Sequence, residues 1–407
     1  MSFFKEKSDQ EINLILDVGN GSVAGALVLF KDGLAPKIIY SKRLPLTVPQ
    51  KTEKDKLSAL VLHILEEVLV GISEEGLARL QELEFSNEKV THTFCVLSSP
   101  WYISKTKILK IENDEPILIN KNFIESLLQK EEGLFQEEVT QRQIGAISPD
   151  DIDVIEKKII QTKLNGYITK DPYQKKARQI ELAIFMSLAS KNIVRSIETI
   201  VGRFFYSKNM MFTSYSLAEH NVVSDIFSNE SDFVFMDISS EVTDISSVEK
   251  GILMETTSFP LGRNHLVAKV AEEFNVLPEI ALSFIKMHAR GHAEEVSAEK
   301  IDRALQKAKE DWNNYFFHAI SDVAKGHTPS KIFVTVDSDV APFFVSSIKD
   351  NLSSAQKNTT DFQAIPVILL DEEKLSQFVE FDGQAKRDPF LALESIFFNK
   401  LFNTISE

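Results

Sequence analysis

The chain has 407 residues, of which 43% are hydrophobic and 26% are charged, a balance typical of water-soluble globular proteins. Its formal charge of −15 and its lack of a basic stripe argue against unaided binding to nucleic-acid phosphates. The single cysteine, Cys95, excludes an internal disulfide and a zinc cluster held by several thiolates. No apolar run is long enough to span a membrane, so the composition predicts a protein of the reducing cytoplasm.

The first half of the chain predicts alternating strands and helices. Residues 12–30 form two apolar strands around a glycine-containing turn, and 57–72 has the periodicity of an amphipathic helix. A strand is predicted at 91–98, with 105–111 as its partner strand. Asn120 is placed to cap a helix that follows it. Further strands are predicted at 153–164 and 178–187, and a helix at 191–205.

The second half repeats the opening pattern before it becomes helical. Two strands at 233–238 and 245–249 are joined by a polar bend, and a third continues to residue 259. Helical periodicity then dominates 266–318. Later strands are predicted at 331–336 and 365–370, and the chain closes with a helix after Asp388-Pro389.

The two hairpins each place an aspartate at the end of their first strand. The segments are Asp17-Val18-Gly19-Asn20-Gly21-Ser22 and, about 220 residues later, Asp237 to Asp244. Two facing hairpin turns can present backbone N–H groups to phosphates from both sides of a cleft, while paired carboxylates hold a hydrated Mg²⁺. The duplication therefore predicts a nucleotide cleft between two related lobes.

On these residues the chain resembles the actin-like ATPases, within them the FtsA cell-division and PilM pilus-assembly proteins. The segments Val154–Lys157, Leu164–Tyr167, Asp171-Pro172 and Ile180–Leu182 are similar to the extra subdomain that FtsA inserts into its first lobe. The resemblance runs from about Ile12 to Phe402. It implies an α/β, actin-like (ribonuclease H-like) two-lobed fold with an FtsA-type insert.

The resemblance divides the chain into four units. The first lobe core comprises 11–92, 189–226 and 388–407, and the insert comprises 93–188. The second lobe core comprises 227–262 and 328–387, and its small subdomain comprises 263–327.

The same resemblance assigns the residues of the cleft. ATP with Mg²⁺ is the implied ligand pair, and Asp17 and Asp237 are the expected metal ligands. Nucleotide contacts are expected from Asp17, Gly19, Asn20, Gly21, Ser22, Asp237, Ser239, Thr243, Asp244 and Lys286. No catalytic residue is assigned.

Several positions of the cleft depart from the family pattern. Ser239, Ser240 and Glu241 stand where the second phosphate loop has glycine or small residues, and a side chain hinders close approach to phosphate. Val336-Asp337 stands in place of a Gly-Gly pair on the adenosine side, and Gly262-Arg263 in place of another. Ala281-Leu282 replaces the Ala-Glu pair that reaches the ribose. These departures predict weakened or lost nucleotide binding.

The C-terminal helix has a broad apolar arc that includes Phe390, Phe397 and Phe402. FtsA proteins commonly end in an amphipathic membrane anchor, but such helices favour Lys and Arg on their polar face. This helix offers only Lys400 there, against Glu394 and Glu407. We therefore expect it to pack on the first lobe, and membrane contact to be peripheral or made through a partner.

The leading hypothesis is a cytoplasmic scaffold of bacterial cell division or type IV pilus assembly, at the inner face of the cell membrane. It would bind protein partners through the insert, with self-association as a further expectation, and it would not be an efficient enzyme. The alternative is an active FtsA- or PilM-like ATPase that works as a nucleotide switch through Ser239, Ser240 and Thr243 hydroxyls. A sugar kinase is a third alternative, disfavoured because the insert resembles that of FtsA.

Overall fold

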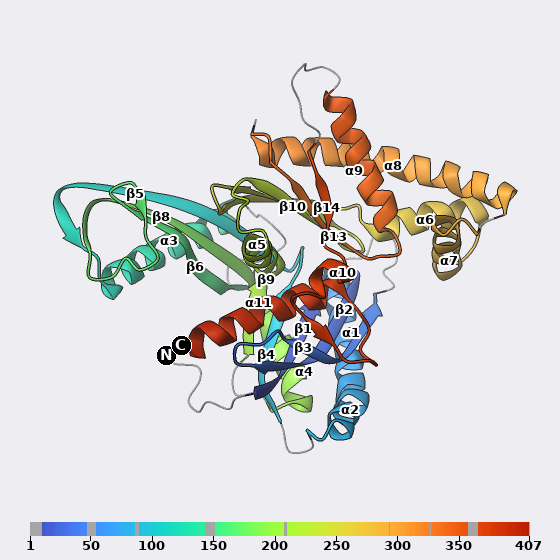
Figure 1. Ribbon diagram of the computed structural model, residues 1–407, viewed down its shortest axis with the longest axis horizontal. Helices are drawn as coiled ribbons and strands as arrows, with labels where there is room; N and C mark the ends of the chain where they lie inside the picture. Colours follow the sequence, from blue (N-terminus) through green and yellow to red (C-terminus); the bar gives the residue numbers. More distant parts are fainter. Residues whose placement is uncertain are drawn as a thin grey trace.

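The computed structural model describes residues 10–46, 54–85, 89–142, 151–206, 210–292, 294–325, 327–356 and 365–406. It consists of two lobes, one above the other in Figure 1, with a long insert that extends to one side of both. Each lobe is built on one β-sheet, and the insert has a sheet of its own.

The first lobe contains a six-stranded sheet in the order β15-β3-β2-β1-β4-β9. β1 and β2 form the predicted hairpin, with Asp17 opposite Ala24, and β4 and β9 add parallel strands on the other side of β1. The strands are β1 (Gln10–Val18), β2 (Ser22–Lys31), β3 (Lys37–Pro45), β4 (Val90–Leu97), β9 (Met210–Ser214) and β15 (Glu380–Phe381).

The second lobe repeats this topology in the order β12-β11-β10-β13-β14. Its hairpin pairs Asp237 with Asp244, and β13 lies parallel to β10 as β4 lies parallel to β1. The strands are β10 (Phe233–Ile238), β11 (Thr243–Glu249), β12 (Ile252–Phe259), β13 (Ile332–Val336) and β14 (Val367–Leu369). The shared order confirms the predicted duplication.

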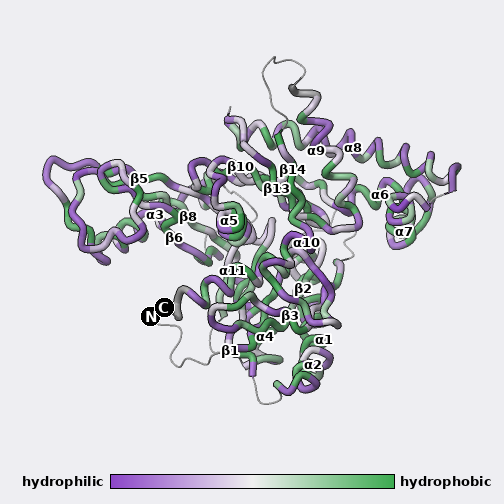
Figure 2. Tube along the Cα trace, in the orientation of Figure 1, coloured by the Kyte–Doolittle hydropathy of each residue, from purple (hydrophilic) through white to green (hydrophobic). Residues whose placement is uncertain are grey.

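Helices cover both sheets and fill the space between the lobes. Figure 2 shows that the central strands of both lobes carry the most hydrophobic stretches, as expected for strands covered on two faces. The helical segments are α1 (Lys54–Gly71), the π-helix η1 (Ile72–Gly76), α2 (Leu77–Glu82), α4 (Lys191–Phe204), α5 (Tyr215–Ile226), α6 (Arg263–Phe274), α7 (Pro278–Ala289), α8 (Glu295–Ala324), α9 (Ala341–Gln356), α10 (Glu372–Leu375) and α11 (Pro389–Ser406).

The C-terminal helix α11 packs against the first lobe, as the sequence predicts. Phe397, Phe398 and Phe402 are buried in the central cluster, together with residues of β1, β2 and α5. Phe398 stacks on Phe94 of β4, with ring centroids 4.2 Å apart. The apolar arc of this helix is therefore used inside the protein. None of the described helices is long and apolar enough to cross a membrane.

The insert is a four-stranded sheet in the order β5-β8-β6-β7 with α3 (Lys121–Arg142) on one face. Its strands are β5 (Tyr102–Leu118), β6 (Ile152–Leu164), β7 (Tyr167–Ile168) and β8 (Lys176–Ser190). Asn120 caps α3 as predicted, since its Oδ1 accepts the Phe123 N–H at 2.9 Å.

One predicted strand pairing is wrong. Residues 105–111 belong to β5, which pairs with β8 and not with β4. β4 already has a parallel partner on each edge, β1 and β9, so no edge is free for β5. A local alternation of residues predicted the strand correctly, but it carries no information about which strand lies beside it.

A buried carboxylate joins the insert to the first lobe. Glu156 of β6 accepts hydrogen bonds from Ser187 Oγ of β8 at 2.7 Å and from Ser214 N at 3.0 Å. Thr213 Oγ1 donates to the other carboxylate oxygen of Glu156. The insert also contacts lobe two, where Gln161 Nε2 donates to the Lys250 carbonyl at 3.1 Å. The insert is thus attached to both lobes.

We predict that Glu156→Ala lowers the free energy of unfolding by about 3 kcal/mol, because it leaves several buried donors without an acceptor. Urea unfolding at neutral pH measures the change. The control is Glu125→Ala, since Glu125 is exposed and pairs with Lys157 at 3.5 Å, an arrangement worth about 0.5 kcal/mol. Equal losses in the two variants would contradict the assigned role of Glu156.

Candidate functional site

The turn of the first hairpin is held by its neighbours in the first lobe. Its two ends are joined by the Gly19 N–H, which donates to the Ser22 carbonyl at 3.1 Å. Trp101 Nε1 donates to the Gly19 carbonyl at 2.8 Å, and Asn20 Nδ2 donates to the Ser99 carbonyl at 2.6 Å. Asn20 is buried as a result. The Trp101 side chain is buried as well.

The turn of the second hairpin is attached to the start of α6. The Ser239 and Ser240 carbonyls accept the N–H groups of Arg263 and Asn264 at 3.0 and 2.8 Å. This requires a glycine at 262, because a Cβ there would lie 2.3 Å from the Ser239 carbonyl oxygen. Glu241 points toward the same helix, where its carboxylate accepts a hydrogen bond from Asn264 Nδ2 at 2.7 Å.

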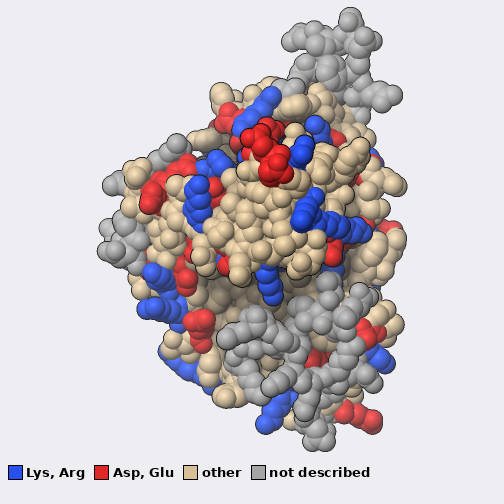
Figure 3. All heavy atoms as spheres, turned by 90° about the vertical axis from the view of Figure 1, so that its left-hand side faces the viewer, with Lys and Arg blue, Asp and Glu red and all other residues tan. Residues whose placement is uncertain are grey.

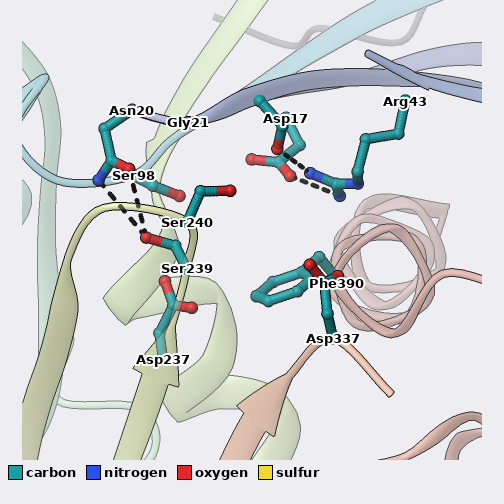
Figure 4. A pocket seen from close by; sticks show the side chains of 12 residues that line it. Asp17, Asn20, Gly21, Arg43, Ser98, Asp237, Ser239, Ser240, Asp337 and Phe390 are labelled. Carbon is teal, nitrogen blue, oxygen red and sulfur yellow. Dashed lines mark hydrogen bonds and ion pairs between the residues drawn. The ribbon is translucent and has the colours of Figure 1, made fainter. Parts of the chain in front are cut away.

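The two turns touch each other across the interface between the lobes (Figure 4). A Cβ added to Gly21 would lie 2.0 Å from the Cβ of Ser240, so no group fits between these two residues. Asn20 Oδ1 accepts the Glu241 N–H at 3.1 Å. A side chain of the first turn therefore uses a backbone donor that a phosphate-binding turn would offer to its ligand.

Arg43 of β3 lies beside the turns and carries the positive charge of the site. Its guanidinium donates to both carboxylate oxygens of Asp388, at 2.6 and 3.1 Å, and to Ser22 Oγ at 2.8 Å. It also pairs with Asp17 at 2.8 Å. Burial opposes the charge, but the carboxylates of Asp388 and Asp17 outweigh it and raise the pKa of Arg43.

The other acidic groups of the site are also removed from water. Burial raises the pKa of Asp17, with Arg43 acting in the opposite direction. Burial also raises the pKa of Asp237 well above its ordinary value, and Asp244 and Glu219 add to the shift. Glu394 of α11 is fully buried, and its pKa is raised by burial and by Asp17. Burial therefore disfavours the ionised form of each of these three carboxyl groups.

The cavity that remains between the turns has a volume of about 20 Å³. This is room for about one water molecule, whereas sites for drug-sized ligands occupy several hundred Å³. Its lining comprises Asp17, Gly19, Asn20, Gly21, Ser22, Arg43, Ser98, Asp237, Ser239, Ser240, Asp337 and Phe390. A nucleotide does not fit between the turns in this arrangement.

The donor set does not suit Mg²⁺ either. Asp17 is paired with the Arg43 guanidinium at 2.8 Å, so its carboxylate already has a cation as partner. Among the residues that the structure describes, no group of three or more His, Cys, Asp or Glu side chains is placed to hold a metal ion.

The structure brings together seven of the ten residues that the sequence assigns to the cleft. Asp17, Gly19, Asn20, Gly21, Ser22, Asp237 and Ser239 line the cavity.

The expectation that Thr243, Asp244 and Lys286 also line the cleft is not met at this cavity. Thr243 Oγ1 is directed toward lobe two, where it donates to the Leu261 carbonyl at 2.7 Å. Asp244 is buried beside Ser99 and Ser258, and burial raises its pKa to about 6. Lys286 pairs with Asp339 at 3.3 Å.

Three residues of the site were missed by the sequence reasoning. Arg43 and Asp388 lie about 345 positions apart in the chain, and only the folded lobe places them together. The expected polar-face position of Glu394 is wrong, since the side chain is fully buried. A weak signal existed for Asp388, because an Asp before Pro caps a helix, and Asp388 Oδ1 does accept the Phe390 N–H at 3.0 Å.

Comparison with known proteins supports the fold. No protein-family model matches the sequence, and no curated protein matches it. Among solved structures, a chain of the PilM–PilN type IV pilus biogenesis complex aligns with a TM-score of 0.63 at 13% identity. The alignment covers 96% of this chain and 98% of that one.

Two further structures align less well. The ethanolamine utilization protein EutJ from Carboxydothermus hydrogenoformans has a TM-score of 0.44 at 12% identity, covering 96% of this chain and 90% of that one. A Bacteroides thetaiotaomicron protein with an actin-like ATPase fold has a TM-score of 0.40 at 11% identity, covering 95% and 96%.

The duplicated sheets and the facing hairpins define the actin-like ATPase fold, as predicted. The full-length alignment with a chain of the PilM–PilN complex is a likeness of this fold.

The buried carboxyl groups predict how stability depends on pH. Glu219 of α5 is fully buried, and burial raises its pKa to about 8 while Thr335 Oγ1 donates to it at 2.7 Å. Between its ordinary value of 4.5 and 8, the unfolded chain loses this proton and the folded chain keeps it. Its contribution to stability is therefore full at low pH and falls as the pH rises through this range.

We predict that Glu219→Gln makes unfolding less sensitive to pH, since glutamine cannot ionise. Relative to the unaltered chain, the variant should gain on the order of 1 kcal/mol per pH unit between pH 5 and pH 8. Urea unfolding at these pH values measures the gain. Glu198→Gln, at an exposed position of α4, is the control. Parallel pH profiles for the unaltered chain and Glu219→Gln would contradict the assignment.

Proposed function

We propose that this chain is a PilM-like assembly protein that binds protein partners in type IV pilus biogenesis and does not turn over nucleotide. The full-length alignment with a chain of the PilM–PilN complex supports the pilus context over cell division. We further propose a location at the inner face of the cell membrane, with membrane contact made through a partner. We also propose that the protein self-associates through the surfaces that bind its partners.

The observation that carries this proposal is the contact between Gly21 and Ser240. The turns that would cradle phosphate already touch, and the cavity beside them has a volume of about 20 Å³. ATP binding would require the lobes to move apart and the bonds between Asn20 and the second turn to break. The closed arrangement is stabilised by contacts within the chain.

The outer end of the insert supports protein binding. Tyr167 and Ile168 of β7 are 80% and 65% exposed, and Leu118 and Tyr173 are 41% and 42% exposed. The Ile119 N–H donates to the Lys175 carbonyl at 2.9 Å, which brings the segments of Leu118 and Tyr173 together. Figure 3 faces this end of the molecule and shows a broad area without charged side chains, bordered by both acidic and basic groups. Exposed apolar and aromatic side chains such as those of Tyr167 and Ile168 are typical of protein interfaces.

A nucleotide switch is the second candidate, and the two buried aspartates on one cavity favour it. Asp17 and Asp237 reach the cavity from equivalent positions of the two hairpins, as an actin-like site requires. Under this alternative, ATP with Mg²⁺ would bind a state in which the lobes are further apart. It would stabilise that state because it binds it more tightly than the closed state.

Asp237→Asn separates the two candidates. Because burial raises the pKa of Asp237 well above its ordinary value, an uncharged asparagine of the same shape should leave stability and partner binding nearly unchanged. A metal site would lose an ionised ligand in this variant. We predict that a strain carrying Asp237→Asn assembles surface pili at the level of the unaltered strain. A non-piliated strain with normal amounts of the protein would contradict the proposal.

Calorimetry provides the direct test of binding. We predict that ATP with Mg²⁺ gives no saturable heat with the unaltered chain at concentrations up to about 1 mM, which corresponds to less than about 4 kcal/mol of binding free energy. Micromolar binding that disappears in Asp237→Asn would instead establish the nucleotide switch.

A further inference from the structure

We infer that Arg43 is a built-in cation of the cleft, which takes over the charge-neutralising role of Mg²⁺ toward Asp17. This inference deepens the proposed function, on which it rests. The inference gives a cause for the closed arrangement. The Arg43 side chain replaces the metal that the resemblance predicts. The negative charge of Asp17 is then neutralised whether or not a ligand is bound.

The contacts of Arg43 match those expected of a bridging cation. Its guanidinium lies between two carboxylates, with Asp17 at 2.8 Å on one side and Asp388 at 2.6 and 3.1 Å on the other. Each of its three nitrogen atoms makes a contact, since Nη1 donates to Ser22 Oγ at 2.8 Å. Arginine suits such a site because its charge is permanent and its planar fork matches a carboxylate.

The charges that line the cavity require such a cation. The lining includes Asp17, Asp237 and Asp337. Among the described residues that line the cavity, Arg43 is the one basic residue. The nearby Arg263 is paired with Asp337 at 3.4 Å and with Asp339 at 2.9 Å. Without Arg43, Asp17 and Asp388 would face each other with no positive charge between them, which is costly for groups removed from water.

Arg43 also connects the cleft to α11. Asp388, its bidentate partner, caps this helix by accepting the N–H groups of Phe390 and Leu391 at 3.0 and 3.1 Å. The guanidinium lies 5.3 Å from the centre of the Phe390 ring. The position at which α11 begins is therefore tied to the same cation that neutralises Asp17. Loss of the cation should loosen both the cleft and the helix.

The test is Arg43→Met, which keeps an unbranched side chain and removes the charge. We expect its midpoint of thermal unfolding to fall by about 5–10 °C. The matched control is Lys42→Met on the same strand, whose ion pair with the exposed Glu75 spans 3.3 Å. Its expected shift is about 1 °C or less. Equal shifts in the two variants would overturn the inference.

The cation role is then tested by adding a metal. In Arg43→Met, 10 mM MgCl₂ should raise the unfolding midpoint by about 2–4 °C relative to NaCl of equal ionic strength, because the carboxylates vacated by Arg43 bind Mg²⁺. The unaltered chain and the double variant Arg43→Met/Asp17→Asn should show no such rise. A folded Arg43→Met that does not respond, or a response of equal size in the unaltered chain, would overturn the inference.

Arg43→Lys keeps the test decisive where Arg43→Met fails to fold. Lysine retains the charge but loses the fork, so this variant should fold, unfold below the unaltered chain, and show no response to Mg²⁺. An Arg43→Lys chain that fails to fold, or that Mg²⁺ stabilises, would show that the charge at this position is not the essential property. Neither result bears on ATP binding by the unaltered chain, so failure of this inference and failure of the proposed function remain distinguishable.

Discussion

The contact of Gly21 with Ser240 is the constraint on which the rest of the site depends. It brings the two hairpin turns together, so a Cβ at Gly21 would overlap Ser240, and the cavity between the lobes shrinks to about 20 Å³. Asn20 then reaches the second turn, where its Oδ1 accepts the Glu241 N–H, and the N–H groups of Gly19 and Ser239 are bonded within their own turns. The two hairpin turns of this actin-like fold therefore contact each other directly.

Closing the cleft removes several carboxyl groups from water, and the structure deals with them in two ways. Asp17 and Asp388 share the charge of Arg43, whereas burial raises the pKa values of Asp237, Glu219 and Glu394 and so favours their protonated forms. Protonated acids in a protein interior cost little at low pH and more as the pH rises. We therefore expect these buried carboxyl groups to make the folded protein less stable as the pH rises.

The sequence predicts much of the fold because the hairpins, the helix cap at Asn120 and the apolar arc of α11 are local patterns. It misassigns the partner of residues 105–111, because strand pairing is decided by which edges remain free. At the site, the turn residues are predictable from their spacing. Arg43 and Asp388 are not, because their pairing depends on register across the sheet and on the return of α11 to it.

The central claim, that the lobes are closed without nucleotide, is tested most directly by the distance between them. Spin labels at Glu74→Cys on lobe one and Ser321→Cys on lobe two occupy exposed positions, while Cys95 is buried. Double electron–electron resonance should give one narrow distance distribution, unchanged by ATP with Mg²⁺. A distribution that is broad without nucleotide, or that shifts when ATP and Mg²⁺ are added, would contradict the account.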